Sequence, residues 1–228
     1  MSGRLSVVVP ALGEAAVIGA ALRALAPLRA AGEEVIVVDG GSADGTAEAA
    51  RGLADRVLVC RPPGRARQMN AGAAVARGTI LWFLHADTLP APGAAEAIRA
   101  AVAAGAGWGR FDVRLSGAHP LLRVVERAMN LRSRLTGIAT GDQGIFVRRD
   151  WFEAAGGFPD IPLMEDIALS RALRRRGRPA CLAGPLVTSS RRWEAHGVVR
   201  TILLMWRLRL AYFLGADPAR LARRYARP

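Results

Sequence analysis

Three acidic positions in this sequence follow apolar runs or open a helical pattern. Asp39 ends the run VIVVD and begins a glycine-rich turn, Asp87 follows the run ILWFLHA, and Asp166 stands beside Glu165 ahead of the segment IALS. A carboxylate in a turn can accept hydrogen bonds from a ribose or base, one near phosphates can anchor Mg²⁺ or Mn²⁺, and one at a helix start can act as a general base. His85 lies two residues before Asp87, so both side chains could face the same ligand.

Each of these positions also has a purely structural explanation. Asp39 could bond its own turn backbone, and Asp87 could cap a turn while His85 is a satisfied polar residue of the core. Glu165 and Asp166 could serve only to complement a helix dipole. Taken singly, the residues leave these alternatives open.

Short apolar runs alternate with helical patterns in the first half of the chain. The predicted strands are residues 5–9, 34–38, 56–59 and 80–84, and the predicted helices are residues 15–30, 46–53 and 65–77. Runs rich in Val, Leu and Ile are typical of strands covered on both faces, and this alternation predicts a parallel sheet with right-handed crossovers. Ligands of such sheets bind beyond the carboxyl ends of the strands, where Asp39 and Asp87 stand.

The second half is less regular. It predicts strands at residues 108–115 and 144–147 and helices at residues 120–135 and 164–176, followed by a tail from 194 to 225 that is broken at 215–218. There is no internal repeat, and no clean division into two domains.

The chain of 228 residues suits one α/β domain with or without an appendage. Its net charge is +13 and all its basic residues are arginines, which predicts attraction to nucleotide diphosphates, acidic lipids or nucleic acid without choosing among them. Cys60 and Cys181 flank apolar runs and are predicted to be small buried thiols. With no signal peptide visible at the start, the cytoplasm is the expected compartment.

The tail contains an apolar stretch at residues 198–214 that Arg200, Arg207 and Arg209 interrupt. A spanning helix needs roughly 18 or more uninterrupted apolar residues, so this segment should not cross a membrane. It could lie on an anionic bilayer, at the inner face of the cell membrane, or dock on the rest of the protein with its arginines outward. Both alternatives remain open.

The motifs in their order resemble family 2 glycosyltransferases. The resemblance rests on VVPALGE at 8–14, VVDGGSADGT at 37–46, LHAD at 84–87 and the acidic pair at 165–166. The segments GRARQMNAG at 64–72, GDQG at 141–144 and TSSRRW at 188–193 look like one small bacterial subgroup. The resemblance implies a GT-A fold, with a mostly parallel Rossmann-like sheet. It predicts a catalytic domain over residues 1–195 and a C-terminal amphipathic helical extension over 196–228.

The resemblance also implies roles for individual residues. Asp166 would be the catalytic base with Glu165 beside it, and Asp87 would match the last acid of the family's DxD motif and hold Mg²⁺ or Mn²⁺. The nucleotide-sugar pocket would comprise Pro10, Ala11, Glu14, Asp39, Arg67, Asn70, His85 and Ala86. The sugar and acceptor region would comprise Gly141, Asp142, Gln143, Arg191, Arg192 and Trp193. Arg191 and Arg192 follow a predicted strand, so they could also bind the leaving diphosphate, or they could belong only to a generally basic surface.

One departure from the family pattern is His85, which replaces the first acid of DxD. This should loosen the dependence on a particular metal or pass the contact to ribose, and His196 is a candidate second ligand.

The implied activity is inverting transfer from a nucleotide-diphosphate sugar to an unidentified acceptor. A polyprenyl, carotenoid or glycolipid molecule would suit a membrane-bound tail. A sugar nucleotidyltransferase is the alternative enzyme, although the chain has no lysine for a triphosphate. A basic nucleic-acid-binding module is the non-enzymatic alternative, although no nucleic-acid motif is present and no specific nucleic-acid partner is expected.

Overall fold

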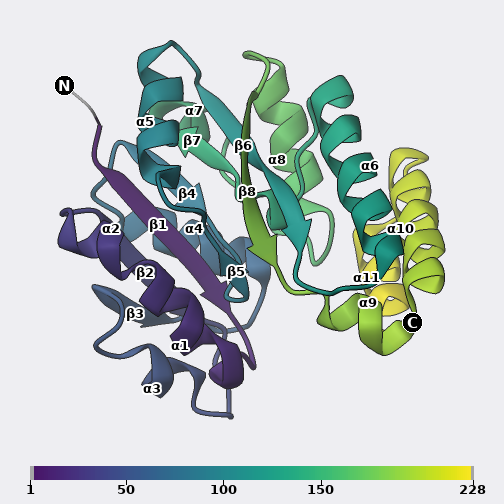
Figure 1. The fold of residues 1–228 in the computed structure, drawn as a ribbon, viewed down its shortest axis with the longest axis horizontal. Helices are drawn as coiled ribbons and strands as arrows, with labels where there is room; N and C mark the ends of the chain where they lie inside the picture. Colours follow the sequence, from purple (N-terminus) through teal and green to yellow (C-terminus); the bar gives the residue numbers. More distant parts are fainter. Residues whose placement is uncertain (1–2, 227–228) are drawn as a thin grey trace.

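The computed structural model describes residues 3–226, and within them a single mixed sheet forms the centre of an α/β fold (Figure 1). Its strands are β1 (Leu5–Ala11), β2 (Glu34–Asp39), β3 (Arg56–Val59), β4 (Ile80–Phe83), β5 (Thr88–Leu89), β6 (Trp108–Leu115), β7 (Phe146–Arg148) and β8 (Ala180–Thr188). Their order is β3-β2-β1-β4-β7-β6-β8-β5. Strands β5 and β7 run antiparallel to their neighbours and the other pairings are parallel, so the predicted mostly parallel sheet is confirmed.

Helices cover both faces of this sheet. They are α1 (Ala15–Ala24), α2 (Ala26–Ala30), α3 (Thr46–Ala50), α4 (Arg65–Val75), α5 (Ala94–Ala103), α6 (Pro120–Thr136), α7 (Arg149–Ala154), α8 (Glu165–Arg174), α9 (Arg191–His196), α10 (Val198–Phe213) and α11 (Pro218–Ala226), with a short 3₁₀ helix η1 (Gly141–Gln143). Among the helices of residues 3–226, none is both long enough and apolar enough to cross a membrane.

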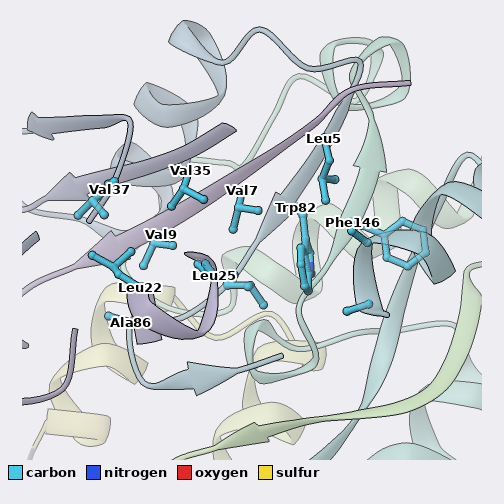
Figure 2. Close-up of a cluster of buried hydrophobic side chains, with 14 of the residues drawn as sticks. Leu5, Val7, Val9, Leu22, Leu25, Val35, Val37, Trp82, Ala86 and Phe146 are labelled. Atoms are coloured by element: carbon cyan, nitrogen blue, oxygen red, sulfur yellow. The ribbon is translucent and has the colours of Figure 1, made fainter. Parts of the chain in front are cut away.

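The central strands are apolar throughout because each of their faces packs against helices. Val7 and Val9 of β1 face the cluster that contains Leu22 of α1, while Val8 faces the opposite cluster with Met69 of α4. Figure 2 shows part of the first cluster, in which Trp82 of β4 also lies. Burial on both faces explains why these strands read as continuous apolar runs.

Strand β1 continues two residues beyond its predicted end, through Pro10 to Ala11. Residues two apart in a strand point to the same neighbour, and the Val8 carbonyl accepts a bond from Leu84 N on the β4 side. The missing N–H of Pro10 therefore points to the same side, where β4 has already ended at Phe83. The proline costs the sheet no ladder hydrogen bond there.

A glycine inside α4 sets how closely this helix approaches the sheet. A β-carbon at Gly72 would overlap Val8 Cγ1 and lie 3.1 Å from Val38 Cγ2. We expect Gly72→Ala to lower the free energy of unfolding by about 2 kcal/mol, because overpacking a dense core costs about 1–3 kcal/mol. Gly19 of α1 is the matched control, since a β-carbon there would meet only the Arg23 side chain. Gly19→Ala should stabilise the protein by about 0.5–1 kcal/mol in the same urea titration, and equal effects at both sites would contradict this account.

Several predicted boundaries were wrong. The single helix predicted over 15–30 is two helices, α1 and α2, the second starting with Pro27 in its first turn. The tail begins as two helices separated by Gly197, whose φ of 81° no helix interior accommodates. Strand β5 and helices α5 and α7 were not predicted. Strand β8 contains Gly184 and Pro185, which are residues typical of turns. Cys60 and Cys181 are half-buried rather than buried.

The C-terminal helices dock on the rest of the protein. Leu208 of α10 and Leu221 of α11 form a buried cluster with Ile138, Met164 and Ile167, which belong to the segments around η1 and α8. The C-terminal helices therefore form part of the surface around η1 and the start of α8. The division of the chain at residue 195 stays a prediction.

Candidate active site

The sheet has a topological switch point between β1 and β4. From β1 the chain passes to β2 on one side, and it later returns as β4 on the other side, so the connections at the carboxyl ends of β1 and β4 diverge. Such a point leaves a crevice for ligands in open α/β sheets. A cavity of about 460 Å³ lies at this end of the sheet. Of the predicted site residues, it is lined by His85, Asp87, Asp142, Arg191, Arg192, Trp193 and the candidate ligand His196.

Arg191 bridges two of the predicted acids. Its Nη2 lies 2.8 Å from Glu14 Oε2 and 3.4 Å from Asp87 Oδ2. The hydrogen bond to Glu14 is the main reason why the pKa of Arg191 is raised. A positive charge is therefore held between two carboxylates at the ends of β1 and β4. Because about half of the Arg191 side chain is exposed, it can exchange these partners for a ligand.

His85 pairs with an acid from another part of the chain. Its Nδ1 lies 3.2 Å from Asp142 Oδ1. Burial opposes the charged forms of both groups, but their hydrogen bond and mutual attraction outweigh it, so the pKa of His85 is raised and that of Asp142 is lowered. A β-carbon at Gly141 would overlap His85 Nε2, which accounts for glycine at this position. The carboxylate that the DxD pattern lacks at residue 85 is thus supplied nearby in space by Asp142.

Glu165 is a structural partner of Arg65. The two side chains form an ion pair with 2.8 Å between Arg65 Nε and Glu165 Oε1, and Glu165 is only 2% exposed. Burial raises the pKa of Glu165, and the charge of Arg65 counteracts that rise. Since Arg65 lines the large cavity, the pair holds a guanidinium at the cavity wall. Glu165 therefore holds the Arg65 guanidinium in place, and its predicted part in catalysis stays a prediction.

Asp166 is oriented by backbone donors. Its Oδ2 accepts a hydrogen bond of 2.8 Å from Gly141 N, and its Oδ1 one of 2.7 Å from Ile167 N. The preceding turn contains Met164 in the left-handed region, with φ of 71°, buried against the C-terminal helices. Such a conformation costs a residue other than glycine about 1–2 kcal/mol, and strain of this kind collects at functional sites.

Asp87 and Asp166 do not line the same cavity. Asp166, Gly141 and Glu165 line a second, much smaller pocket of about 10 Å³. His85 lines both pockets, and the bond from Gly141 N joins Asp166 to the η1 segment that carries Asp142. The two acids are therefore neighbours across His85 and η1 rather than opposite walls of one cleft.

Other predicted nucleotide residues have structural partners instead of lining the large cavity. Both Asp39 oxygens accept bonds from Gly41 and Ser42 of the residue's own turn, which is the structural alternative for Asp39. Arg67 Nε lies 2.8 Å from Asp160, and the Asn70 amide exchanges bonds with Phe158 N and O. Pro10, Ala11 and Ala86 are buried, and Gln143 is fully buried in a capping box with Thr140. Nucleotide or sugar binding by these residues stays a prediction.

Sequence reasoning missed residues that the fold brings to the cavity from far along the chain. Arg65, Thr188, Ser189, Met205 and Tyr225 are among its lining residues. The Tyr225 ring of α11 lies 3.7 Å from the Arg192 guanidinium carbon, so the last helix closes one side of the cavity. The motif GRARQMN contained Arg65 and the motif TSSRRW contained Thr188 and Ser189, but none of these three was predicted as a site residue. No local signal places α11 at the end of the sheet.

Removing Arg65 should expose the cost of burying Glu165. We expect Arg65→Met to lower the free energy of unfolding by about 3 kcal/mol at neutral pH, because a buried carboxylate loses its partner. The pKa of Glu165 is already raised in the folded state and will rise further. The folded protein then binds the extra proton, so stability falls as pH rises above the ordinary value of 4.5 and recovers below it.

Urea unfolding at acidic and neutral pH measures this effect. Arg51→Met is the control, since the ion pair of Arg51 with Glu48 is exposed. A deficit of the Arg65 variant that does not change with pH would contradict the assignment.

Comparisons with known proteins agree with this architecture. The family model described as "Glycosyl transferase family 2" matches residues 6–154. The PGL/p-HBAD biosynthesis glycosyltransferase of Mycobacterium tuberculosis (strain ATCC 25618 / H37Rv) is 38% identical over 88 residues, which are 36% of this chain and 34% of that protein. The match thus spans about a third of that curated relative.

Solved structures share the fold at low identity. S. aureus TarS 1-349 superposes with a TM-score of 0.68 at 19% identity, over 82% of this chain and 60% of that one. The mannosyltransferase PcManGT from Pyrobaculum calidifontis, in complex with GDP-Man and Mn²⁺, gives a TM-score of 0.68 at 23% identity, over 96% and 67%. Glucosyl-3-phosphoglycerate synthase from M. tuberculosis, with Mn²⁺ and UDP-Glc, gives 0.59 at 22%, over 82% and 70%.

The family model covers well over half of the chain, and the α/β sheet with its flanking helices matches GT-A structures. The chain therefore belongs to glycosyl transferase family 2.

Proposed function

We propose that this protein transfers a sugar from a nucleotide-diphosphate sugar to an acceptor hydroxyl with inversion at the anomeric carbon. The observation that carries the proposal is the convergence of Asp87, the His85–Asp142 pair and Arg191 on one cavity at the carboxyl ends of β4, β6 and β8. Asp166 lies beside this cavity with its carboxylate oriented by backbone N–H groups. Related structures contain nucleotide sugars and Mn²⁺, which supports a donor of this class.

The donor diphosphate would bind at the arginine-rich wall. Arg65, Arg191 and Arg192 line the cavity, and guanidinium groups form strong charge-assisted hydrogen bonds with phosphate oxygens. A diphosphate entering here would draw Arg191 away from Glu14 and Asp87. The arginines would then stabilise the charge that develops on the leaving group.

Asp87 fits a divalent cation only together with the substrate. Within residues 3–226, no group of three His, Cys, Asp or Glu side chains could hold a metal ion by itself. A single carboxylate is a sufficient protein anchor when phosphates and waters supply the other ligands, as they commonly do for Mg²⁺. Asp87 would hold the cation once Arg191 has moved to the diphosphate. A bound Mg²⁺ or Mn²⁺ would supply Lewis-acid stabilisation of the departing diphosphate.

Asp166 would act on the acceptor. As the acceptor oxygen bonds to the anomeric carbon, the bond from that carbon to the diphosphate oxygen breaks, and the hydroxyl proton passes to the Asp166 carboxylate. The bonds from Gly141 N and Ile167 N hold the carboxylate without providing a proton relay. Attack from the side opposite the leaving group gives inversion.

The acceptor side of the cavity is built largely by the C-terminal helices. Trp193, Met205 and Tyr225 give this wall apolar surface beside the arginines. An acceptor with an apolar portion, such as a lipid or carotenoid, fits this wall better than a purely polar sugar.

Screening a panel of nucleotide sugars with Mn²⁺ and with Mg²⁺ tests the proposed function. We expect slow hydrolysis of one donor class that releases a nucleoside diphosphate. Release of pyrophosphate from a nucleoside triphosphate and a sugar phosphate would instead show a nucleotidyltransferase. Absence of donor binding across the panel would refute the proposal.

A further inference from the structure

The helix α10 carries an exposed apolar stripe on the side that does not dock. Its members follow each other at spacings of three or four residues, so they share one helix face. They are Val199, Leu203, Trp206, Leu210 and Phe213, followed by Leu214, each 46–78% exposed. The docked face carries other residues, among them Thr201, Met205 and Leu208. This apolar stripe is therefore left over after the helix has packed on the protein.

The neighbouring helix α6 carries a second stripe of the same kind. Leu121, Val124, Leu131 and Leu135 are 39–70% exposed and lie on one face. The opposite face of α6 is buried through Leu122 and other residues. Single exposed apolar residues are ordinary, but two ordered stripes on adjacent helices are not.

The two stripes face the same side of the helix pair. Leu122 and Val125 of α6 cluster with Val198 and Ile202 of α10, which fixes the side on which the helices touch. Figure 1 shows α6 and α10 next to each other. The buried residues of each helix recur at helical spacing. On one side of the contact, both helices therefore face the protein core, and on the other side both face solvent. Each apolar stripe lies on the solvent flank. We call the two stripes together the α6–α10 face.

The charge around this face is positive. Arg127, Arg200 and Arg207 are exposed and form no ion pair among the described residues. Helix α10 contains no acidic residue, and the single acid of α6, Glu126, is buried and bonded to Leu115 N. An apolar strip with arginine at its edges and an exposed tryptophan matches an anionic lipid surface, since tryptophan favours the headgroup region.

We propose that the α6–α10 face docks on a bilayer that contains anionic phospholipids. Charge complementarity selects this partner, because arginines attract the lipid phosphates and would repel one another across a symmetric contact between two copies of the chain. The opposite side of α10 contributes Thr201 and Met205 to the large cavity, so docking would hold that cavity about one helix diameter, roughly 10 Å, from the lipid surface. The acceptor would then be a molecule held in the membrane, and this step rests on the proposed function.

Cosedimentation of the full chain with vesicles tests the docking. We expect binding to vesicles of phosphatidylcholine mixed with phosphatidylglycerol, and little binding to phosphatidylcholine alone. The double variant Trp206→Ser/Leu210→Ser should bind at least about tenfold more weakly, and so should Arg200→Gln/Arg207→Gln, since each basic residue near an anionic surface is worth about 1 kcal/mol. Val59→Ser is the matched control, because Val59 is 58% exposed on β3, outside the α6–α10 face.

Several outcomes would overturn the docking. They are failure of the unmodified chain to bind mixed vesicles, full binding by the Trp206/Leu210 variant, or a loss with Val59→Ser as large as with that variant. A dimer in solution that the Trp206/Leu210 variant abolishes would assign the face to a second copy instead. Donor hydrolysis in vesicle-free buffer separates the two proposals. It should be unchanged in the face variants, and its absence in the unmodified chain would refute the enzyme proposal while vesicle binding still stood.

Discussion

Replacing Asp166 by asparagine is expected to lower kcat by a factor on the order of 10² to 10⁴, the usual contribution of a general base. Asparagine has the same shape, and its amide oxygen can still accept the 2.8 Å bond from Gly141 N, which comes from a distant segment; the bond lost is the one from the adjacent Ile167 N. The turn at Met164 and the helix start should therefore persist. The variant would lose the group proposed to take the proton from the acceptor, while donor binding at the arginines of the cavity should be left intact.

Steady-state turnover and donor affinity, measured separately, check this expectation. The dissociation constant of the donor should stay close to that of the unmodified protein while kcat falls. Asp150→Asn is the control, since Asp150 is an exposed acid on α7 whose side chain, within residues 3–226, bonds only that of Arg148. Turnover that survives in Asp166→Asn with normal affinity would remove this residue from catalysis.

The central strands and the acids at their ends could be predicted because their signals are local. The runs that became β1, β2 and β4 are apolar on both faces, which the sequence displays directly. Because the ends of these strands could be predicted, so could the position of Asp87 just beyond the carboxyl end of β4. Burial on both faces gives a parallel sheet a strong sequence signal.

The parts of the site that could not be predicted depend on contacts across long sequence separations. Arg65 and Glu165 pair across 100 residues, and the position of Tyr225 over Arg192 depends on how α11 docks. Neither contact leaves a periodic or spacing signal in the chain. The same holds for Asp166, whose orientation depends on Gly141 N of a distant segment.

Asp39 is the opposite case. The sequence already offered a structural explanation for this residue, namely hydrogen bonding within its own turn, and the structure contains those bonds. Its two oxygens bond the turn that follows, which any aspartate before Gly-Gly-Ser could do. A motif therefore identifies where a ligand site is built, but it does not separate residues that shape the loop from residues that touch the ligand. The structure shows that Asp39 shapes its loop, and contact of this residue with a nucleotide stays a prediction.

At residue 85 a histidine replaces the first acid of the family pattern, and the fold places another acid beside it. The acid missing from the strand end is provided by Asp142 of η1, but it is held in an ion pair with the histidine that replaced it. Asp87 is paired instead with Arg191, which is more exposed than His85 and can be exchanged more readily for a ligand. The cation-binding capacity of the site should consequently depend on Asp87 more than on Asp142.

We therefore expect Asp87→Asn to lower turnover by about 10²-fold or more and to raise the Mn²⁺ concentration needed for half-maximal activity. A Lewis acid at the leaving group contributes several kcal/mol, and about 3 kcal/mol corresponds to roughly two powers of ten in rate. The measurement is turnover at saturating donor across a Mn²⁺ titration, with a chelator as the zero point.

The comparison variant is Glu14→Gln, because Glu14 and Asp87 share the same Arg191 Nη2. Both substitutions release the guanidinium, so a loss caused by misplacing Arg191 should appear in both variants and leave the Mn²⁺ requirement alone. A shift in that requirement confined to Asp87→Asn would assign the cation to Asp87. High activity of Asp87→Asn that a chelator does not reduce would mean that Arg191 and its neighbours stabilise the leaving diphosphate without a metal, and the Asp87 assignment would have to be abandoned.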